Sequence, residues 1–366
     1  MTAQHGYLVL ADISGFTAFM AGTELEHSHD ILRELLELIV SRLTPMLTLA
    51  SVDGDAVFAF ASEARLPRGE TLLELVEAAY AAFKDRQEAI RRRTTCTCRA
   101  CRSVPNLDLK FIAHHGDYVA ERAGNGYDVH GLDVHLVRER LLKQNVSEAT
   151  GWTGYAVFSE PCLAHLRIHP GTMHAGTGTY AHVGAVKTFS LNLMARYKEL
   201  TEARRVFLAP EDADVVYVRD FSAPPPVVWE WLNDPIKRSQ YMRGRVWRAG
   251  ARPAGRTGVG ANNHCTHGAG QLVETVLDWR PFDYFTVEIK PPSSGRTLVV
   301  TYQLEPLRDG NGTRLTSRAT ARMRLPRWLT RRLFKPLARL MFQYDFTNLA
   351  RQVANAAGRE APAMER

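Results

Sequence analysis

The sequence predicts an α+β protein made of two domains. The chain has 366 residues, which is more than one domain usually needs. Strand-like and helix-like segments alternate as far as residue 194, whereas residues 213–357 contain a short helix, several strands and one long terminal helix. Residues 195–212 are charged and contain a proline, which is typical of a linker. The final residues, 358–366, are predicted to form a disordered tail.

The elements of the first domain follow one another in a regular order. Residues 7–12 are mostly aliphatic and predict a buried strand that ends at Asp12. Apolar residues at helical spacing predict a helix over 24–43. The remaining pattern predicts two short strands joined at Asp53-Gly54, a helix over 69–93, a strand over 107–115, a helix over 132–145 and a strand pair near 180–191.

Composition limits the class of protein but does not choose its partner. Apolar residues make up 45% and charged residues 23%, as in soluble globular proteins. No apolar run approaches the roughly 18 residues of a membrane span, and the N-terminus lacks the basic and apolar segments of a signal peptide. We therefore expect a cytoplasmic protein. The net charge of +7 fits an acidic partner such as a nucleotide, a nucleic acid or an anionic membrane.

Two aspartates are candidates for a metal site. Asp12 ends a predicted buried strand and is followed by Gly15, and Asp55 follows the predicted hairpin turn. If the two strands are neighbours, the carboxylates converge, and a carboxylate pair in a cleft is a common way to hold Mg²⁺ or Mn²⁺ on phosphates. The alternative is that each aspartate caps a turn or a helix on its own.

Several motifs resemble class III nucleotidyl cyclases. Residues 12–17 (DISGFT) are similar to the family's metal-binding strand end, and Gly54-Asp55 is similar to its second metal aspartate. Residues 127–137 (YDVHGLDVHLV) resemble a later motif in which an aspartate contacts the base, and residues 111–117 (FIAHHGD) resemble a strand ending in a turn. The resemblance covers roughly residues 5–194.

This resemblance implies a fold and a set of functional residues. The fold is a ferredoxin-like core, and the assembly is a head-to-tail homodimer in which each active site is shared between two chains. Asp12 and Asp55 would hold Mg²⁺ or Mn²⁺, and Asp128 would face the base of a nucleoside triphosphate. The backbone around four residues would cradle the phosphates: Ile13, Gly15, Phe16 and Thr17.

The chain departs from the family pattern where catalysis is concerned. Ser51 stands where the family has its base-selecting lysine, and His135 replaces the asparagine that orients the ribose. The position of the arginine that neutralises the phosphoryl group holds Glu139, with Arg138 and Arg140 on either side. A helix turns about 100° per residue, so a one-residue shift re-aims the side chain substantially, although a long arginine can recover part of the distance. His135, Arg138 and Arg140 are the candidate replacements. Cyclisation, nucleotide binding without catalysis and a purely structural role all stay open.

The segment CTCRAC places Cys96, Cys98 and Cys101 within six residues. Three thiolates at this spacing can bind one soft cation such as Zn²⁺. The fourth ligand could come from His114, His115, Cys162 or a second chain. The alternative is a set of free thiols in a loop.

The second domain resembles the START-like helix-grip fold of the polyketide-cyclase-like superfamily. The segment VVWEWLNDP followed by SQY carries the resemblance, which covers about residues 213–357. It implies a curved antiparallel sheet around the long C-terminal helix and a cavity for a lipid or another hydrophobic small molecule. The candidate wall residues, for each of which ordinary core packing is the alternative, are Trp229, Leu232, Tyr241, Trp247, Phe285, Tyr302, Phe334, Met341 and Phe342.

Residues 327–342 (RWLTRRLFKPLARLMF) contain five basic residues and no acidic one. A basic amphipathic helix can make peripheral contact with an anionic membrane. The alternative is a core helix with a solvated basic face. No nucleic-acid-binding module is recognisable, and we expect no nucleic-acid partner.

Together these observations favour one function and leave a second open. The first is metal-dependent binding of a nucleoside triphosphate, with or without conversion to a cyclic nucleotide, under the control of a hydrophobic ligand. The second is a catalytically inactive dimeric sensor or carrier of a lipid-like molecule. The second domain offers no recognisable pair of nucleophile and base.

Overall fold

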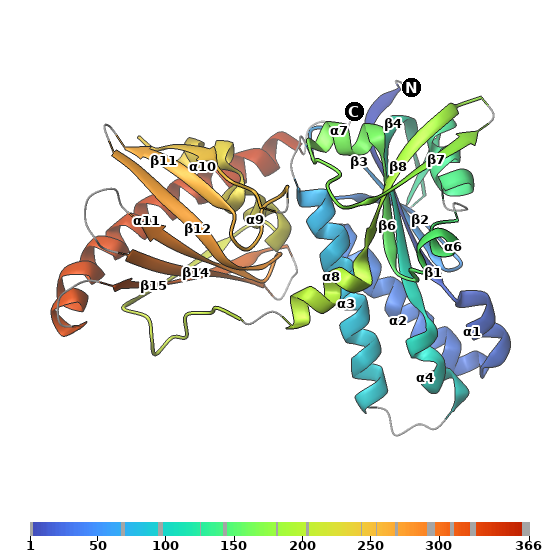
Figure 1. Cartoon of the computed structure of the whole chain (residues 1–366), viewed down its shortest axis with the longest axis horizontal. Coiled ribbons are helices and arrows are strands. Elements are labelled where there is room, and N and C mark those ends of the chain that lie inside the picture. The colour runs from blue at the N-terminus through green and yellow to red at the C-terminus, as the bar shows by residue number, and fades with distance from the viewer. Residues whose placement is uncertain are drawn as a thin grey trace. The chain divides into compact units, whose positions relative to one another are not determined.

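The computed structural model divides the chain into two compact units, Met1–Ala203 and Arg204–Arg366, each built around its own sheet (Figure 1). The structure describes residues 3–66, 70–93, 98–124, 126–141, 145–180, 182–202, 205–242, 244–253, 255–267, 270–290, 297–307, 311–322 and 327–360.

The first unit contains eight strands among its described residues. They are β1 (Gln4–Ser14), β2 (Thr48–Asp53), β3 (Ala56–Ser62), β4 (Asp108–Ala123), β5 (Gly126–His130), β6 (Tyr155–Ser159), β7 (His174–Tyr180) and β8 (Gly184–Asn192). The helical segments are α1 (Phe16–Gly22), α2 (Leu25–Leu43), α3 (Thr71–Arg93), α4 (Arg99–Ser103), η1 (Val104–Asn106), α5 (Leu132–His135), η2 (Leu136–Arg140), α6 (Val146–Thr150), α7 (Glu160–Leu166) and α8 (Leu193–Glu202).

The sheet of the first unit has the order β2-β3-β1-β4-β6-β8-β7, and β5 pairs with β4. The strands β4-β1-β3-β2 are mutually antiparallel, with α2 in the connection from β1 to β2 and α3 in the connection from β3 to β4. This βαββαβ arrangement is the ferredoxin-like core that the sequence led us to expect.

Strand β1 is central, which explains its unbroken run of apolar residues. Its neighbours are β3 and β4, and Tyr7 to Ala11 are each at most 3% exposed. Leu8 and Leu10 pack in one core cluster with Val134 and Val137, which come from α5 and η2. Helix α2 contacts β3 and packs on α3 (Figure 1). A strand buried on both faces cannot alternate polar and apolar residues.

The helix expected over residues 132–145 differs from the prediction. α5 is a single turn, and it passes into the π-helical turn η2, in which the Leu141 N–H bonds to the carbonyl of Leu136. Residues 142–144 lie outside the described part of the chain. A π-turn rotates each residue by less than an α-helix does, so the side-chain directions expected from 100° per residue do not apply here.

The second unit is an antiparallel sheet with one long helix. Its elements are β9 (Val215–Phe221), α9 (Pro225–Asn233), α10 (Pro235–Tyr241), β10 (Val246–Ala249), β11 (Asn262–His267), β12 (Gly270–Arg280), β13 (Tyr284–Lys290), β14 (Thr297–Pro306), β15 (Thr313–Arg322) and α11 (Arg327–Glu360). The strand order is β10-β11-β12-β13-β14-β15-β9. The short helix expected from the sequence is α9, and α10 follows it as a second helix. Prolines stand in the first turns of both, where their missing N–H costs nothing.

The core of the second unit lies between this sheet and α11 (Figure 1). Trp229, Phe285 and Phe342 are at most 3% exposed, and Phe342 stacks on Phe346 of the same helix. Pro336 lies inside α11, which continues through it to Glu360. The predicted fold class, α+β with a helix-grip second domain, is confirmed.

The basic stretch of α11 has an uneven exposure. Ala338 is buried, whereas Leu337 and Leu340 are 67% and 65% exposed and lie beside exposed Lys335 and Arg339. Residues 323–326 and the side chains of 327–331 lie outside the described part. Peripheral membrane contact stays a prediction. Over the described residues, every helix is too short or too polar to cross a bilayer.

Candidate functional site

The two candidate metal aspartates are neighbours at one end of β1 and β3. Asp12 pairs across the sheet with Ala56, the residue after Asp55, and the Ile13 N–H donates to the Asp55 carbonyl at 3.1 Å. Burial and the charge of Asp55 raise the pKa of Asp12 to about 6, against the opposing effect of Lys110. Burial also raises the pKa of Asp55. Two half-buried carboxylates that repel each other are a site at which a divalent cation would be stabilising.

The loop after Asp12 requires glycine at position 15. Gly15 has a φ of 86°, in the left-handed region, and is the N-cap of α1, whose Phe19 N–H donates to the Gly15 carbonyl at 2.9 Å. A Cβ at this position would lie 3.0 Å from the carbonyl oxygen of Asn106, at the end of η1. The chain therefore turns at Gly15 from β1 directly into α1, close to the end of η1.

A pocket of about 520 Å³ lies on the same face of the sheet as Asp12. Leu10, Ala56 and Phe58 form part of its wall. Leu10 pairs with Phe58, and Ala56 pairs with Asp12. Because residues two apart on a strand share a face, the side chain of Asp12 follows Leu10 along this wall. Asp12 pairs with the lining residue Ala56 and Asp55 precedes it in the chain, so both aspartates lie next to the edge of the pocket without belonging to its lining.

The opposite wall carries two of the predicted catalytic residues. His135 and Arg138 both line the pocket, together with Asp53. The Nη2 atom of Arg138 donates to Ser51 Oγ at 3.0 Å and forms an ion pair with Asp53, while its guanidinium lies over the ring of Phe58 at 4.9 Å. The charge of Arg138 is thus already paired. The side chain of Arg140, the third predicted catalytic residue, lies outside what the structure describes.

Asp128 has a different environment from the one expected. It lies on β5, is exposed, and has its Oδ1 atom 3.2 Å from His130 Nε2. Its neighbours Val129 and His130 line the pocket, but Asp128 itself is outside the lining. In a single chain, therefore, the structure brings His135 and Arg138 into the pocket, places Asp12 and Asp55 at its edge, and leaves Asp128 outside it.

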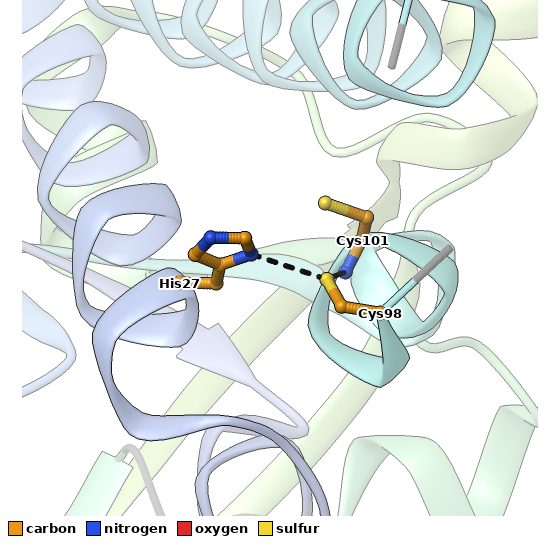
Figure 2. A group of neighbouring side chains, drawn as sticks. All are labelled: His27, Cys98 and Cys101. Atoms are coloured by element: carbon orange, nitrogen blue, oxygen red, sulfur yellow. Dashed lines mark hydrogen bonds between the residues drawn. The ribbon is translucent and has the colours of Figure 1, made fainter. Parts of the chain in front are cut away.

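The cysteine segment meets a histidine that the sequence analysis missed. Cys98 and Cys101 stand at the start of α4, whereas Cys96 lies outside the described residues. The Nδ1 atom of His27, on α2, is 3.3 Å from Cys98 Sγ, as Figure 2 shows. Ligand atoms of His27, Cys98 and Cys101 all lie within 4.8 Å of one another. No spacing signal marks His27, because 71 residues separate it from Cys98.

The fourth ligands considered from sequence have other surroundings. His114 bonds to Ser159 Oγ at 2.8 Å and lies 3.4 Å from Asp133, and Cys162 is completely buried at the start of α7. His115 contacts His165 and Glu63 instead. Among the described residues, His27 is the histidine that contacts Cys98.

A second group of histidines surrounds Glu63. His115 stacks on His165 at 3.9 Å, meets His5 edge-on at 4.4 Å, and has its Nε2 atom 3.1 Å from Glu63 Oε1. Burial, then His165 and His5, lower the pKa of His115 to about 4, so its imidazole is neutral at physiological pH. The Nδ1 atom of His5 is 2.6 Å from Asp117 Oδ1. This group lies beyond the pocket lining.

Two parts of the chain match known protein families. Residues 212–354 match the family described as "Polyketide cyclase / dehydrase and lipid transport", which confirms the resemblance drawn for residues 213–357. Residues 32–150 match a family described as "Protein of unknown function (DUF2652)". An uncharacterized protein of Mycobacterium tuberculosis, Rv2561/Rv2562, is 32% identical over 116 residues, or 31% of this chain. The chain spans about half the length, 51%, of this curated relative.

Solved structures similar to the chain include cyclases and a structural-genomics protein. The guanylyl cyclase Cya2 is 18% identical, with a TM-score of 0.36, over 52% of this chain and 92% of that one. The adenylyl cyclase CyaB from P. aeruginosa is 16% identical, with a TM-score of 0.36, over 52% and 95%. Protein CV1439 from Chromobacterium violaceum is 19% identical, with a TM-score of 0.29, over 38% and 94%.

Proposed function

We propose that the first unit binds a nucleoside triphosphate together with Mg²⁺ or Mn²⁺. The proposal is supported chiefly by the meeting of Asp12 and Asp55, whose mutual repulsion and raised pKa values favour a shared cation. The pocket beside them, at about 520 Å³, falls in the size range of small-molecule sites. In this scheme the backbone from Ile13 to Thr17 would face the phosphates, as the resemblance to nucleotidyl cyclases implies.

Turnover by this site should be slow. A cation that stabilises the transferring phosphoryl group can contribute a factor of about 10³ or more to the rate. Arg138 is the described arginine in the pocket, and its charge is paired with Asp53 and its Nη2 bonded to Ser51. A guanidinium that must first leave a carboxylate is a poor stabiliser of developing charge. Binding of the metal-nucleotide with little cyclisation is therefore our preferred function.

The proposal includes a head-to-tail homodimer. Asp12 and Asp55 lie at one edge of the pocket, and Asp128 lies outside its lining. A site shared between two chains would bring the aspartates of one copy to His135, Arg138 and Asp128 of the other. The exposed position of Asp128 and the open wall carrying His135 are consistent with a face that a second copy covers.

Thermal unfolding with and without nucleotide tests the binding proposal directly. A ligand held at 100 times its Kd stabilises the folded state by about 2.7 kcal/mol, so Mn²⁺ with ATP or GTP should raise the melting temperature of the first unit by several degrees. Mn²⁺ alone and nucleotide with EDTA are the controls. Product analysis of the same mixtures measures cyclic nucleotide, of which we expect little. The absence of a shift with every Mn²⁺-nucleotide pair would refute the site.

A second proposed function, binding of a hydrophobic small molecule, belongs to the second unit. Its family match supports this, and so do buried polar atoms in its core. The Tyr241 hydroxyl and Asp345 Oδ1 are buried, and neither has a hydrogen-bond partner among the described residues. A buried polar atom without a partner costs about 1–3 kcal/mol unless something satisfies it. A ligand with an apolar body and one polar group would satisfy these atoms.

Replacement of the Tyr241 hydroxyl tests this second function. Native mass spectrometry of the purified protein should show an added organic mass, and Tyr241→Phe should weaken the affinity for that ligand about tenfold, the equivalent of one hydrogen bond, and so lower its occupancy at limiting ligand. The variant should be as stable as the parent, because the hydroxyl is unpaired within the described residues. Tyr284→Phe is the matched control: its hydroxyl donates to Asp278 at 2.7 Å, so stability should fall while occupancy holds. The proposal would be contradicted if the purified protein carried no added mass and if added fatty acids also failed to shift its mass in the same measurement.

A further inference from the structure

The start of α2 and the start of α4 are held together by side chains that suit a metal ion. Figure 2 shows His27 on α2 pointing at Cys98, with Cys101 one turn away. In a tetrahedral zinc site with Zn–S near 2.3 Å and Zn–N near 2.0 Å, two sulfurs are about 3.8 Å apart and a sulfur and a nitrogen about 3.6 Å apart. The observed 3.3 Å between His27 Nδ1 and Cys98 Sγ, and the 4.8 Å limit for all three ligand atoms, agree with this spacing.

The surrounding hydrogen bonds favour ionised sulfur and hold the turn in shape. The Cys101 N–H donates to Cys98 Sγ at 3.4 Å, which stabilises a thiolate more than a thiol. The carboxylate of Glu24 accepts from the N–H groups of Arg99 and Ala100 at 3.1 and 3.0 Å. Glu24 is the N-cap of α2, close to His27. Its carboxylate therefore orients the turn of α4 that contains both cysteines. Such outer contacts are a regular feature of metal sites.

We propose that His27, Cys98 and Cys101 bind one Zn²⁺ ion per chain, with a structural role. Two sulfurs and one imidazole form a soft donor set, which favours zinc over Mg²⁺ or Ca²⁺. The ion links α2 to α4, and α4 continues into η1, whose Asn106 carbonyl backs Gly15. The ion would thus fix the position of α4 and η1, which lie against the loop that follows Asp12. The proposal does not depend on nucleotide binding, because all three ligands lie away from the pocket.

The metal content of the whole protein tests the site. Elemental analysis after purification under reducing conditions should give about one zinc per chain. After removal of zinc by a chelator, added Co²⁺ should produce the d–d and thiolate charge-transfer absorption bands of a tetrahedral site with sulfur ligands. Zn²⁺ should displace the Co²⁺ and abolish these bands. Protein that binds neither ion would overturn the proposal, as would octahedral Co²⁺ spectra without a thiolate band.

Two histidines on one helix provide a matched pair of variants. Loss of an outer contact of a metal site lowers the metal affinity by about 10–100-fold. Loss of a ligand should cost at least as much, so His27→Ala should weaken Zn²⁺ binding by about 100-fold or more. His29→Ala should leave it unchanged, since His29 is an exposed residue two positions along α2. Cys98→Ser should lower the intensity of the thiolate band by about half, because Cys101 still supplies one sulfur ligand. Circular dichroism checks that each variant is folded. Parent-like zinc affinity in His27→Ala, or equal loss in His29→Ala, would show that His27 is not a ligand.

Discussion

Replacing Glu274 by alanine is expected to destabilise the second unit by about 3–5 kcal/mol. Glu274 and Arg238 are 1% and 3% exposed, and they form two parallel bonds of 2.9 and 2.5 Å. The guanidinium also lies 3.6 Å from the ring of Trp247. Removal of the carboxylate leaves a buried cation, which remains charged because arginine does not deprotonate in proteins. Removal of the carboxylate alone therefore lowers the free energy of unfolding by more than the intact ion pair contributes to it.

Tryptophan fluorescence during urea unfolding measures this effect. Five of the six tryptophans, all except Trp152, lie in the second unit, so the signal reports mainly on that unit. Asp220→Ala is the control, since Asp220 forms the same two-bonded pair with Arg314 at the surface, where both side chains are about half exposed. Surface pairs contribute about 0–1 kcal/mol. Equal losses in the two variants would mean that burial does not determine the cost.

The order of elements could be predicted because each is specified locally. The aliphatic run ending at Asp12 gave β1, and Asp53-Gly54 gave the hairpin that places Asp55 beside it. Prolines before a helical pattern indicated the start of α9, whereas α10 was not predicted. In each of these, the backbone geometry of a few residues determines the structure, so a single sequence contains the necessary information.

The candidate sites were harder to predict because they depend on tertiary contacts. The π-turn η2 changes the direction of Arg138, and its approach to Ser51 and Asp53 depends on how α5 packs on the sheet. His27 is distant in sequence from Cys98, so nothing in the helical pattern of α2 distinguishes it from His29. The buried ion pair of Arg238 and Glu274 could not be predicted either, since neither residue belongs to a recognisable motif and 36 positions separate them.

Asp12→Asn is expected to weaken ligand binding more than any other single substitution considered. It should also raise the stability of the ligand-free protein. In the fold, burial and the charge of Asp55 raise the pKa of Asp12 from its ordinary value of 3.8 to about 6. The folded protein therefore holds this proton more tightly than the unfolded chain does. Stability of the ligand-free protein then falls as the pH rises from 3.8 to about 6. Asparagine cannot ionise, so the variant should melt at a higher temperature than the parent at neutral pH.

The same variant should lose its response to Mn²⁺-nucleotide. A 100-fold weaker Kd reduces the stabilisation at fixed ligand from about 2.7 to about 0.4 kcal/mol. At about 2–4 °C per kcal/mol, the melting shift falls from about 5–10 °C to about 1 °C. Asp30→Asn, on the exposed face of α2 where Asp30 pairs with Arg33, should keep the full shift. A structural aspartate would behave in the opposite way: its replacement would lower the ligand-free melting temperature and preserve the shift. Because the two roles differ in the sign of the first effect, the ligand-free melting curve alone separates a cation site from a capped turn.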